Sequence, residues 1–163
     1  RGLGDVYKRQ TVKVALPHTW NAADGMFGNT DYYRGLCNYS RKLSVPAHYR
    51  GKRFFLKVMA AQTVADIFVD RHFVMQHKGG YTAFVAELTD FLVPGTESVL
   101  EIRVGNAQTM DVAPICGDFN MFGGLYWGGW TAGDGGCLHR TCLLCFFRCI
   151  LHSVRWYRRK RPV

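Results

Sequence analysis

The sequence lacks any apolar run long enough to cross a bilayer, although 48% of its 163 residues are hydrophobic. A membrane-spanning helix needs roughly 18 consecutive apolar residues or more. The longest apolar stretch, CLLCFFRCIL, is shorter than that and contains Arg148. The chain also begins without a Met or an apolar signal segment, so the sequence predicts no particular compartment.

An excess of one charge is missing from the middle of the chain. The formal net charge is +9, from 21 basic and 12 acidic residues, but residues 11–130 hold eleven of the basic and ten of the acidic ones. Nucleic-acid binding needs a basic face that follows a phosphate backbone, and this near-neutral stretch offers none. We therefore expect neither nucleic acid nor a membrane as partner. Nucleic-acid binding stays open only for the cluster Arg158–Arg161.

The two ends differ in composition from the middle. Before residue 127 cysteine occurs only at Cys37 and Cys116, but residues 137–149 contain four. The segment Asp5–Gln10, DVYKRQ, resembles the translation of a transposon-end adapter used in DNA library preparation, the alternative being an ordinary polar tail. We predict an adapter-derived tail over residues 1–10, one domain over residues 11–126, and a frameshifted or otherwise non-native tail over residues 127–163.

The C-terminal tail leaves two alternatives open. Its soft potential ligands are Cys137, Cys142, Cys145, Cys149, His139 and His152. Structural zinc sites usually present two ligand pairs about a dozen residues apart, with polar turns between them, whereas these cysteines are interleaved with Leu, Phe and Ile. Abundant Cys, Arg, Trp and Gly without a period is typical of a GC-rich gene read in the wrong frame. We expect no metal and no cofactor; a genuine basic extension is the other alternative.

Helical periodicity is also missing, because residues 11–126 show no apolar period of 3.6 longer than about two turns. Short alternating runs occur instead. In Ser98–Gly105, Leu100, Ile102 and Val104 alternate with charged residues, which predicts a strand with one buried face. Further strands are predicted over Leu36–Val45, Lys52–Met59 and Thr63–Asp70, the last rich enough in β-branched residues to be covered on both faces.

Turn residues separate these runs. The predicted turns contain Pro46, Gly51, Asp70-Arg71, Gly79-Gly80 and Pro94-Gly95. A single helical turn is expected in ELTDFL, with Thr89 or Asp90 as its cap. Several short strands at this spacing predict an all-β fold built as an antiparallel β-sandwich.

Six blocks follow one another in a specific order between residues 16 and 126. They are LPHTWN, YYRGLCNY, VPAHYRGKRFFLKV, HKGGYTAF, LTDFLVPG and DVAPICGDFNMFGGLY. In this order they resemble the N-terminal, sugar-binding domain of glycoside hydrolase family 2. The GDFN and GGLY segments resemble bacterial β-galactosidases most, and β-glucuronidases of the same family are the alternative.

The resemblance implies a jelly-roll sandwich of the galactose-binding-like type, which the family places before an immunoglobulin-like domain and a catalytic (β/α)₈ barrel. It implies two partners, the barrel of the same protein and a β-galactoside or related sugar. The match stops after Tyr126, where the family continues with an Arg and an apolar strand but this chain has Trp127. We therefore expect a sandwich without its last strand, with an open sheet edge and marginal stability.

Glycoside hydrolysis needs two carboxylates that flank the bond to be cleaved. In the family both come from the barrel, so the resemblance implies a non-catalytic fragment of a β-galactosidase-like enzyme of carbohydrate metabolism, which is inactive alone. Glu87, Glu97 and Glu101 are then expected to be ordinary solvated carboxylates. A free-standing carbohydrate-binding module is the alternative from another class, because sandwiches commonly carry sugar sites.

The resemblance implies a sugar contact from this domain. Asp118 matches an Asp that bonds hydroxyls of the cleaved sugar in the galactosidase relatives, and an ionised carboxylate accepts two hydroxyl donors. Phe119 and Phe122 would shield these bonds or stack on the sugar's C–H face. Asn120 is a second substrate-binding candidate, with a turn-forming role as its alternative.

Other polar and aromatic residues invite functional roles. The galactosidase relatives also use an Asn from an earlier loop, for which both Asn21 and Asn29 remain candidates. His18 and His77 have no partners spaced as a catalytic triad, so structural roles are expected, with His77 bonded inside a turn in which Gly79 and Gly80 supply positive φ. Core positions are expected for the aromatic residues Trp20, Tyr32, Tyr33 and Tyr81, with a carbohydrate-binding platform as the alternative.

Overall fold

A computed structural model describes residues 10–22, 24, 33–107, 110–112, 122–125, 141–145 and 151–156. These residues form strands and connecting turns, with no α-helix among them. The described segments contain one 3₁₀ turn, η1 (Ala47–Tyr49). The predicted all-β fold class is confirmed.

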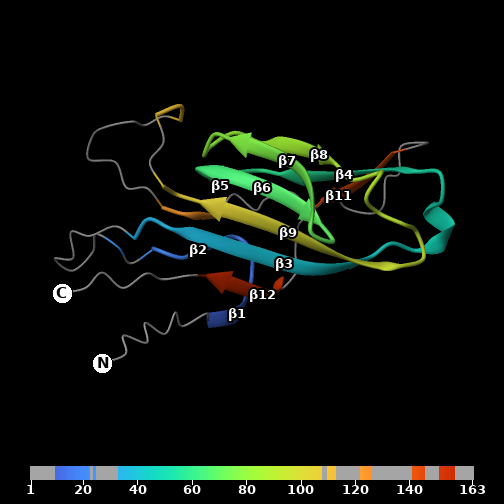
Figure 1. Cartoon of the computed structure of the whole chain (residues 1–163), viewed down its shortest axis with the longest axis horizontal. Coiled ribbons are helices and arrows are strands. Elements are labelled where there is room, and N and C mark those ends of the chain that lie inside the picture. Colours follow the sequence, from blue (N-terminus) through green and yellow to red (C-terminus); the bar gives the residue numbers. More distant parts are fainter. Residues whose placement is uncertain are drawn as a thin grey trace, which may run out of the picture.

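The larger sheet has six strands in the order β1-β12-β3-β9-β6-β7, and every neighbouring pair is antiparallel (Figure 1). Its strands are β1 (Gln10–Val14), β12 (Leu151–Trp156), β3 (Leu36–Ser44), β9 (Glu97–Gly105), β6 (Val64–Val69) and β7 (His72–Lys78). One three-stranded sheet contains β11 (Thr141–Cys145), β4 (Arg53–Val58) and β8 (Phe84–Glu87). The other contains β2 (His18–Thr19), β10 (Gly124–Leu125) and β5 (Ala61–Gln62).

The core forms where the apolar positions of the sheets meet. Leu100, Ile102 and Val104 of β9 are at most 1% exposed, as their alternation predicts. Buried side chains of β4, β6 and β8 belong to the same cluster, which makes the fold a sandwich. Burial of each such Leu or Ile side chain contributes about 1.5–3 kcal/mol relative to exposure.

Strand β6 is covered more on one face than on the other. Ala65, Ile67 and Val69 are fully buried, whereas the alternate residues are half-buried. The guanidinium of Arg103 lies 4.1 Å from the ring centroid of Phe68, so a long side chain of β9 covers part of the outer face. The prediction that both faces of β6 are covered is therefore confirmed for the inner face. The outer face is only partly covered.

The β6–β7 hairpin confirms one predicted turn. Asp70 and Arg71 have φ values of 48° and 71°, the two left-handed residues that a type I′ hairpin requires. The Asp70 carboxylate also accepts a hydrogen bond from the Val99 amide at 2.7 Å, which ties the turn to β9.

The turn in ELTDFL forms, but the predicted cap is wrong. The Leu88 carbonyl accepts hydrogen bonds from the Phe91 and Leu92 amides at 3.0 and 3.1 Å, which closes a single turn. The Thr89 hydroxyl instead accepts a bond from the Phe54 amide at 3.0 Å. The Thr89 hydroxyl therefore bonds a strand residue that is distant in sequence, whereas the local sequence pattern had predicted that it would cap the helical turn.

One end of the sandwich collects segments that are far apart in sequence. Leu36 begins β3 opposite Gly105, where β9 ends, and Gly105 also pairs with Val64 at the start of β6. Lys78, the last residue of β7, pairs with Val64 as well. We call this the loop end. In Figure 1 it lies on the left, opposite η1.

Two strands of the C-terminal tail pair with the sandwich. β12 lies between β1 and β3, and β11 pairs in parallel with β4. β12 and β11 therefore cover the edges that β3 and β4 would otherwise expose, while the loss of the family's last strand stays a prediction. Unpaired edge strands present free backbone donors and acceptors, which an extended segment can satisfy. This pairing leaves the non-native origin of residues 127–163 a prediction.

Candidate functional site

The two residues predicted to bind sugar, Asp118 and Asn120, lie outside the described residues, as do Phe119 and Asn29. The structure describes the attachments on both sides of the segment that carries Asp118 and Asn120, residues 113–121, which we call the late loop. It likewise describes the residues that flank residues 25–32, the early loop. Both segments leave from the loop end.

The late loop is attached on its C-terminal side through Gly123. The Gly123 amide donates a buried hydrogen bond of 2.7 Å to Oδ1 of Asn21. The Gly123 carbonyl accepts bonds from the Thr19 hydroxyl at 2.7 Å and from the Trp20 amide at 3.2 Å. Both backbone polar groups of one residue are therefore satisfied by the segment around β2, about 100 residues earlier in the chain.

Close contacts explain why residues 123 and 124 are both glycine. A side chain at Gly123 would collide with the indole ring of Trp20. A Cβ at Gly124 would collide with the His18 carbonyl and lie 2.9 Å from Cα of Thr19, and Gly124 has a φ of +156°. Gly123 and Gly124 allow close packing of two backbones and so have a structural role next to the late loop.

The N-terminal side of the late loop is attached to β7. Lys78 and Asp111 form an ion pair, and Val112 is buried. Both charged side chains are about half exposed, so the pair contributes little to stability and mainly restricts where the chain runs. Residues on both sides of the late loop are thus bonded to the sandwich.

The early loop is closed in a similar way. Oδ2 of Asp24 accepts a 2.7 Å hydrogen bond from the Tyr33 amide, which joins the two sides of the loop. Asn106 is fully buried; its Oδ1 accepts from the Gly35 amide at 2.7 Å and its Nδ2 donates to the Tyr33 carbonyl at 2.9 Å. The early loop is therefore tied to the end of β9.

Asn21 was one of two candidates for an early sugar contact, and the structure gives it another place. The residue is only 2% exposed, and its carboxamide oxygen bonds the Gly123 amide. Sequence reasoning missed this role, as well as those of Asp24 and Asn106. A buried Asn among apolar strand residues is a signal that backbone groups need partners, but the partners' identity does not follow from local sequence.

His18 lies at the base of this region. Its Nδ1 is 3.0 Å from the hydroxyl of Tyr39, and the two rings meet edge to face. Burial lowers the pKa of His18 from its ordinary value, since the low-dielectric surroundings disfavour the imidazolium. The expected structural role of His18 fits this geometry.

The lowered pKa of His18 predicts how stability depends on pH. The unfolded chain binds the proton more tightly than the folded chain, so the free energy of unfolding should fall as pH drops below about 6.5. We expect the urea midpoint to decrease between pH 7.5 and 5.5, and His18→Gln to flatten this dependence. His48→Gln, which changes an exposed imidazole, is the control. Equal slopes in both variants would contradict this role of His18.

His77 and the two glycines after it give a mixed result. Nε2 of His77 lies 3.1 Å from the Thr82 hydroxyl, and its ring stacks on Phe84 at 4.1 Å, so the predicted bond within the turn is present. Gly79 has a φ of +135°, but Gly80 does not have positive φ, so that part of the prediction is wrong. Gly80 is required because a Cβ there would collide with the buried side chain of Gln62.

The aromatic residues that were predicted to lie in the core differ in their burial. Trp20 packs against the core, and Tyr33 is half-buried. Tyr81 is 66% exposed, so the expectation is wrong for it, because the turn after Gly80 carries the ring out of the sandwich. Tyr32 lies outside the described residues.

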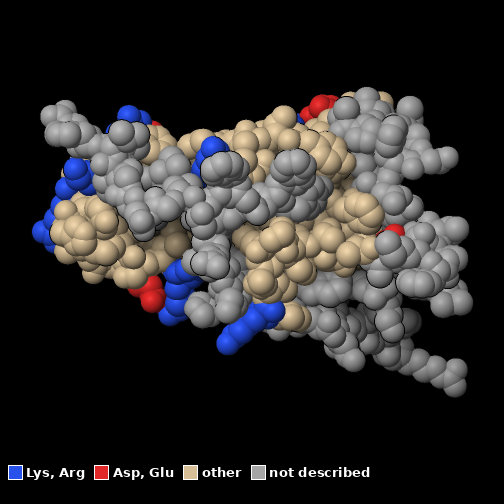
Figure 2. Space-filling view, turned by 180° about the vertical axis from the view of Figure 1, so that it is seen from behind, with Lys and Arg blue, Asp and Glu red and all other residues tan. Residues whose placement is uncertain are grey.

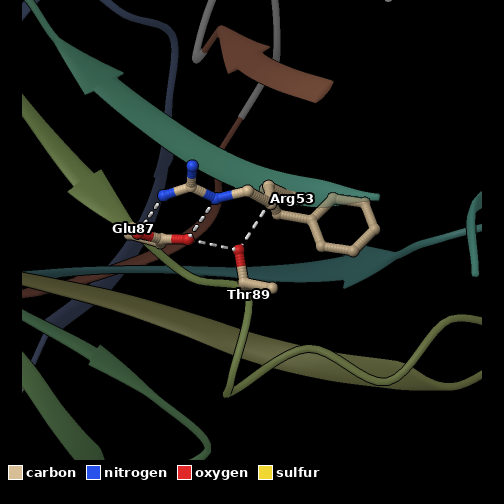
Figure 3. Close-up of polar contacts among 4 residues, drawn as sticks. Arg53, Glu87 and Thr89 are labelled. Carbon is tan, nitrogen blue, oxygen red and sulfur yellow. Dashed lines mark hydrogen bonds and ion pairs between the residues drawn. The ribbon is translucent and has the colours of Figure 1, made fainter. Parts of the chain in front are cut away.

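The three strand carboxylates are engaged in surface ion pairs. Glu87 accepts two bonds from Arg53, at 2.8 and 2.9 Å, and one from the Thr89 hydroxyl (Figure 3). The bonds from Arg53, followed by that from Thr89, lower the pKa of Glu87, which is the opposite of what a general acid needs. Glu97 pairs with Lys42 and is exposed, and the less exposed Glu101 pairs with Arg103. None of the three is arranged as a catalytic carboxylate.

The described residues give little support to the other classes of function. On the face shown in Figure 2, the Lys and Arg side chains of the described residues lie at separate points and form no continuous stripe. No group of three or more His, Cys, Asp or Glu residues in the described segments is placed to hold a metal ion. The same segments include no helix that is long and apolar enough to span a membrane.

Known glycosidases are similar to this chain in sequence. No protein-family model matches the sequence. A β-glucuronidase of Bacteroides fragilis is 41% identical over 116 residues, 71% of this chain and 17% of the relative. A β-galactosidase of Thermoanaerobacter pseudethanolicus is 30% identical over 120 residues, 72% of this chain and 16% of the relative.

Solved structures agree with these relatives. The crystal structure of a Bacteroides uniformis β-glucuronidase is 41% identical and superposes with a TM-score of 0.64, covering 70% of this chain and 13% of that one. The chain thus spans less than a fifth of each of these three relatives. It is homologous to the glycosidases of glycoside hydrolase family 2, and the matched stretch fits the N-terminal sandwich domain of that family.

Proposed function

We propose that this chain supplies the N-terminal domain of a family 2 glycosidase that cleaves β-galactosides, where it supports the catalytic barrel and contributes a contact to the sugar. One observation carries the proposal: the late loop, which bears Asp118, is attached at both sides to the loop end of the sandwich.

The chemistry of the contact follows from the residue types. An ionised Asp118 accepts two neighbouring hydroxyl donors, and charge-assisted bonds of this kind are about twice as strong as neutral ones. Asn120 adds an amide that both donates and accepts. Phe122, which is half-buried next to Gly123, would cover the apolar face of the sugar ring.

Two alternatives remain tied to specific observations. β-Glucuronidases are among the relatives, so a glucuronide is the second candidate substrate. A free-standing carbohydrate-binding module is the second candidate class, since the described strands of all three sheets share one hydrophobic core. Calorimetric binding of galactose at millimolar or tighter affinity by the isolated chain would favour the binding module.

The 163-residue chain is expected to turn over neither nitrophenyl β-galactoside nor nitrophenyl β-glucuronide. Its strand carboxylates are engaged in ion pairs on the outer surface, whereas retaining hydrolysis needs two carboxyl groups about 5–5.5 Å apart across the sugar. Release of nitrophenol above the buffer rate is the measurement. Turnover that remains after the chain is purified again would contradict the proposal that this domain is non-catalytic.

A further inference from the structure

The most exposed apolar side chains of the described residues lie at the loop end. Met110 is 83% exposed and Tyr81 is 66% exposed, the two highest values among the large hydrophobic side chains in this part of the chain. Leu36, where β3 begins, is 47% exposed. Single exposed hydrophobic side chains are common on protein surfaces, whereas several at one place mark a site of interaction. We call these three residues the loop-end rim.

A row of backbone hydrogen bonds crosses the loop end between two of the rim residues. Leu36 lies opposite Gly105 in the pair of β3 and β9. The Gly105 carbonyl accepts a bond from the Thr63 amide at 2.6 Å, and the Thr63 carbonyl accepts one from the Gly79 amide at 3.0 Å. Gly79 belongs to the turn that carries Tyr81. Leu36 and Tyr81 are therefore held on one bonded frame.

The third rim residue is attached to the same end of the sandwich. Met110 directly precedes Asp111, whose carboxylate pairs with Lys78 at the end of β7. Tyr and Met are both enriched in the buried centres of protein interfaces, and the flexible thioether of Met adapts to an uneven apolar surface. The rim therefore fits a partner whose facing surface is apolar.

The outer faces of the sheets differ from the loop end. Polar side chains on the outer face of the large sheet pair with one another, as in Lys42–Glu97, Asp66–Gln76 and Arg103–Glu101. On the small sheet Arg53 pairs with Glu87 in the same way. The exposed ring of Phe73 already packs edge to face against Phe68 at 5.6 Å. Such faces are typical of sheet surfaces that water covers.

We infer that the loop-end rim is part of the surface on which this domain packs against the catalytic domain of its parent glycosidase. The inference rests on the proposed function, which supplies the partner. The chain spans less than a fifth of each of three relatives, so most of such a protein lies outside it and has to contact the sandwich at some surface. The rim is the place where apolar side chains of the described residues are most exposed to water.

The first measurement is hydroxyl-radical footprinting by mass spectrometry, on the 163-residue chain and on the full-length parent enzyme without any substitution. Oxidation of Met110 and Tyr81 should be at least about fivefold slower in the parent, because an interface excludes water from the rim. Phe73, which is 55% exposed, is the internal control and should react equally in both proteins. Equal rates for Met110 in the two proteins would overturn the inference.

The same experiment separates the inference from the proposed function and from self-association. An active parent enzyme with an accessible rim would overturn the docking surface and leave the function intact. A protected rim in a parent that cleaves neither nitrophenyl glycoside would support the docking surface and contradict the proposed function. Rates in the 163-residue chain that fall as its concentration rises would show that the rim binds a second copy of this chain, which would also overturn the inference.

The second measurement compares two triple variants of similar exposure by calorimetry. The rim variant carries Leu36→Ser, Tyr81→Ser and Met110→Ser, and the control variant carries Phe73→Ser, Val85→Ser and Val93→Ser. The rim variant should lower the Tm of the sandwich domain at least about 5 °C more in the parent enzyme than in the 163-residue chain. The control variant should lower both equally, because its side chains face water in both. Equal shifts for the rim variant in parent and chain would contradict docking at the rim.

Discussion

Gly124→Ala is expected to lower the free energy of unfolding by about 3 kcal/mol or more, which places it among the most damaging single substitutions. The added Cβ meets backbone atoms, the His18 carbonyl oxygen and Cα of Thr19, which cannot rotate away as a side chain does. Gly124 also pairs with both Thr19 and Gln62, so the collision separates β10 from its two neighbours. Urea denaturation of the purified chain measures the loss.

Gly51→Ala is the matched control for this substitution. Gly51 also has positive φ, at +78°, but no atom lies within 4 Å of the position that its Cβ would take. Only the left-handed backbone strain remains, which is about 1–2 kcal/mol. If both variants lost the same stability, the close approach of β10 to β2 would not be what requires glycine.

The long strands were predictable because their information is local. In β9 the alternation of apolar and charged residues repeats over the whole strand, and the period alone specifies which face is buried. The β6–β7 turn was predictable for the same reason, since Asp70 tolerates the left-handed region. Six sequence blocks in order then indicated the family, because their order is far more specific than any one block.

The short elements at the loop end were not predictable. β2, β5 and β10 have two residues each, which is too few for any period to appear. They exist because Gly123 and Gly124 approach a segment about 100 residues earlier, and the roles of Asn21 and Asn106 depend on the same long-range contacts. Propensity and pattern describe neighbours in sequence, whereas these residues are specified by neighbours in space.

Asp118→Ala in the full-length parent glycosidase is expected to lower kcat/KM on nitrophenyl β-galactoside on the order of 100-fold or more. A hydrogen bond to a charged group is worth about 1.5–3 kcal/mol, so the loss of two such bonds removes about 3 kcal/mol or more of binding in the transition state. Asp118→Asn keeps one acceptor and should lose about tenfold less. A loss no larger than that of Thr89→Val, which removes the side-chain partner of the Phe54 amide, would show that Asp118 only supports the loop.

We propose that Asp118 bonds hydroxyls of the sugar being cleaved. The most direct measurement compares kcat/KM of the parent enzyme and of its Asp118→Ala variant on nitrophenyl β-galactosides that each lack one hydroxyl. We predict that the effect of the substitution shrinks at least about tenfold on the one or two substrates whose missing hydroxyl is the partner of Asp118. The same loss on every deoxy substrate would contradict a direct contact and leave Asp118 with a purely structural role.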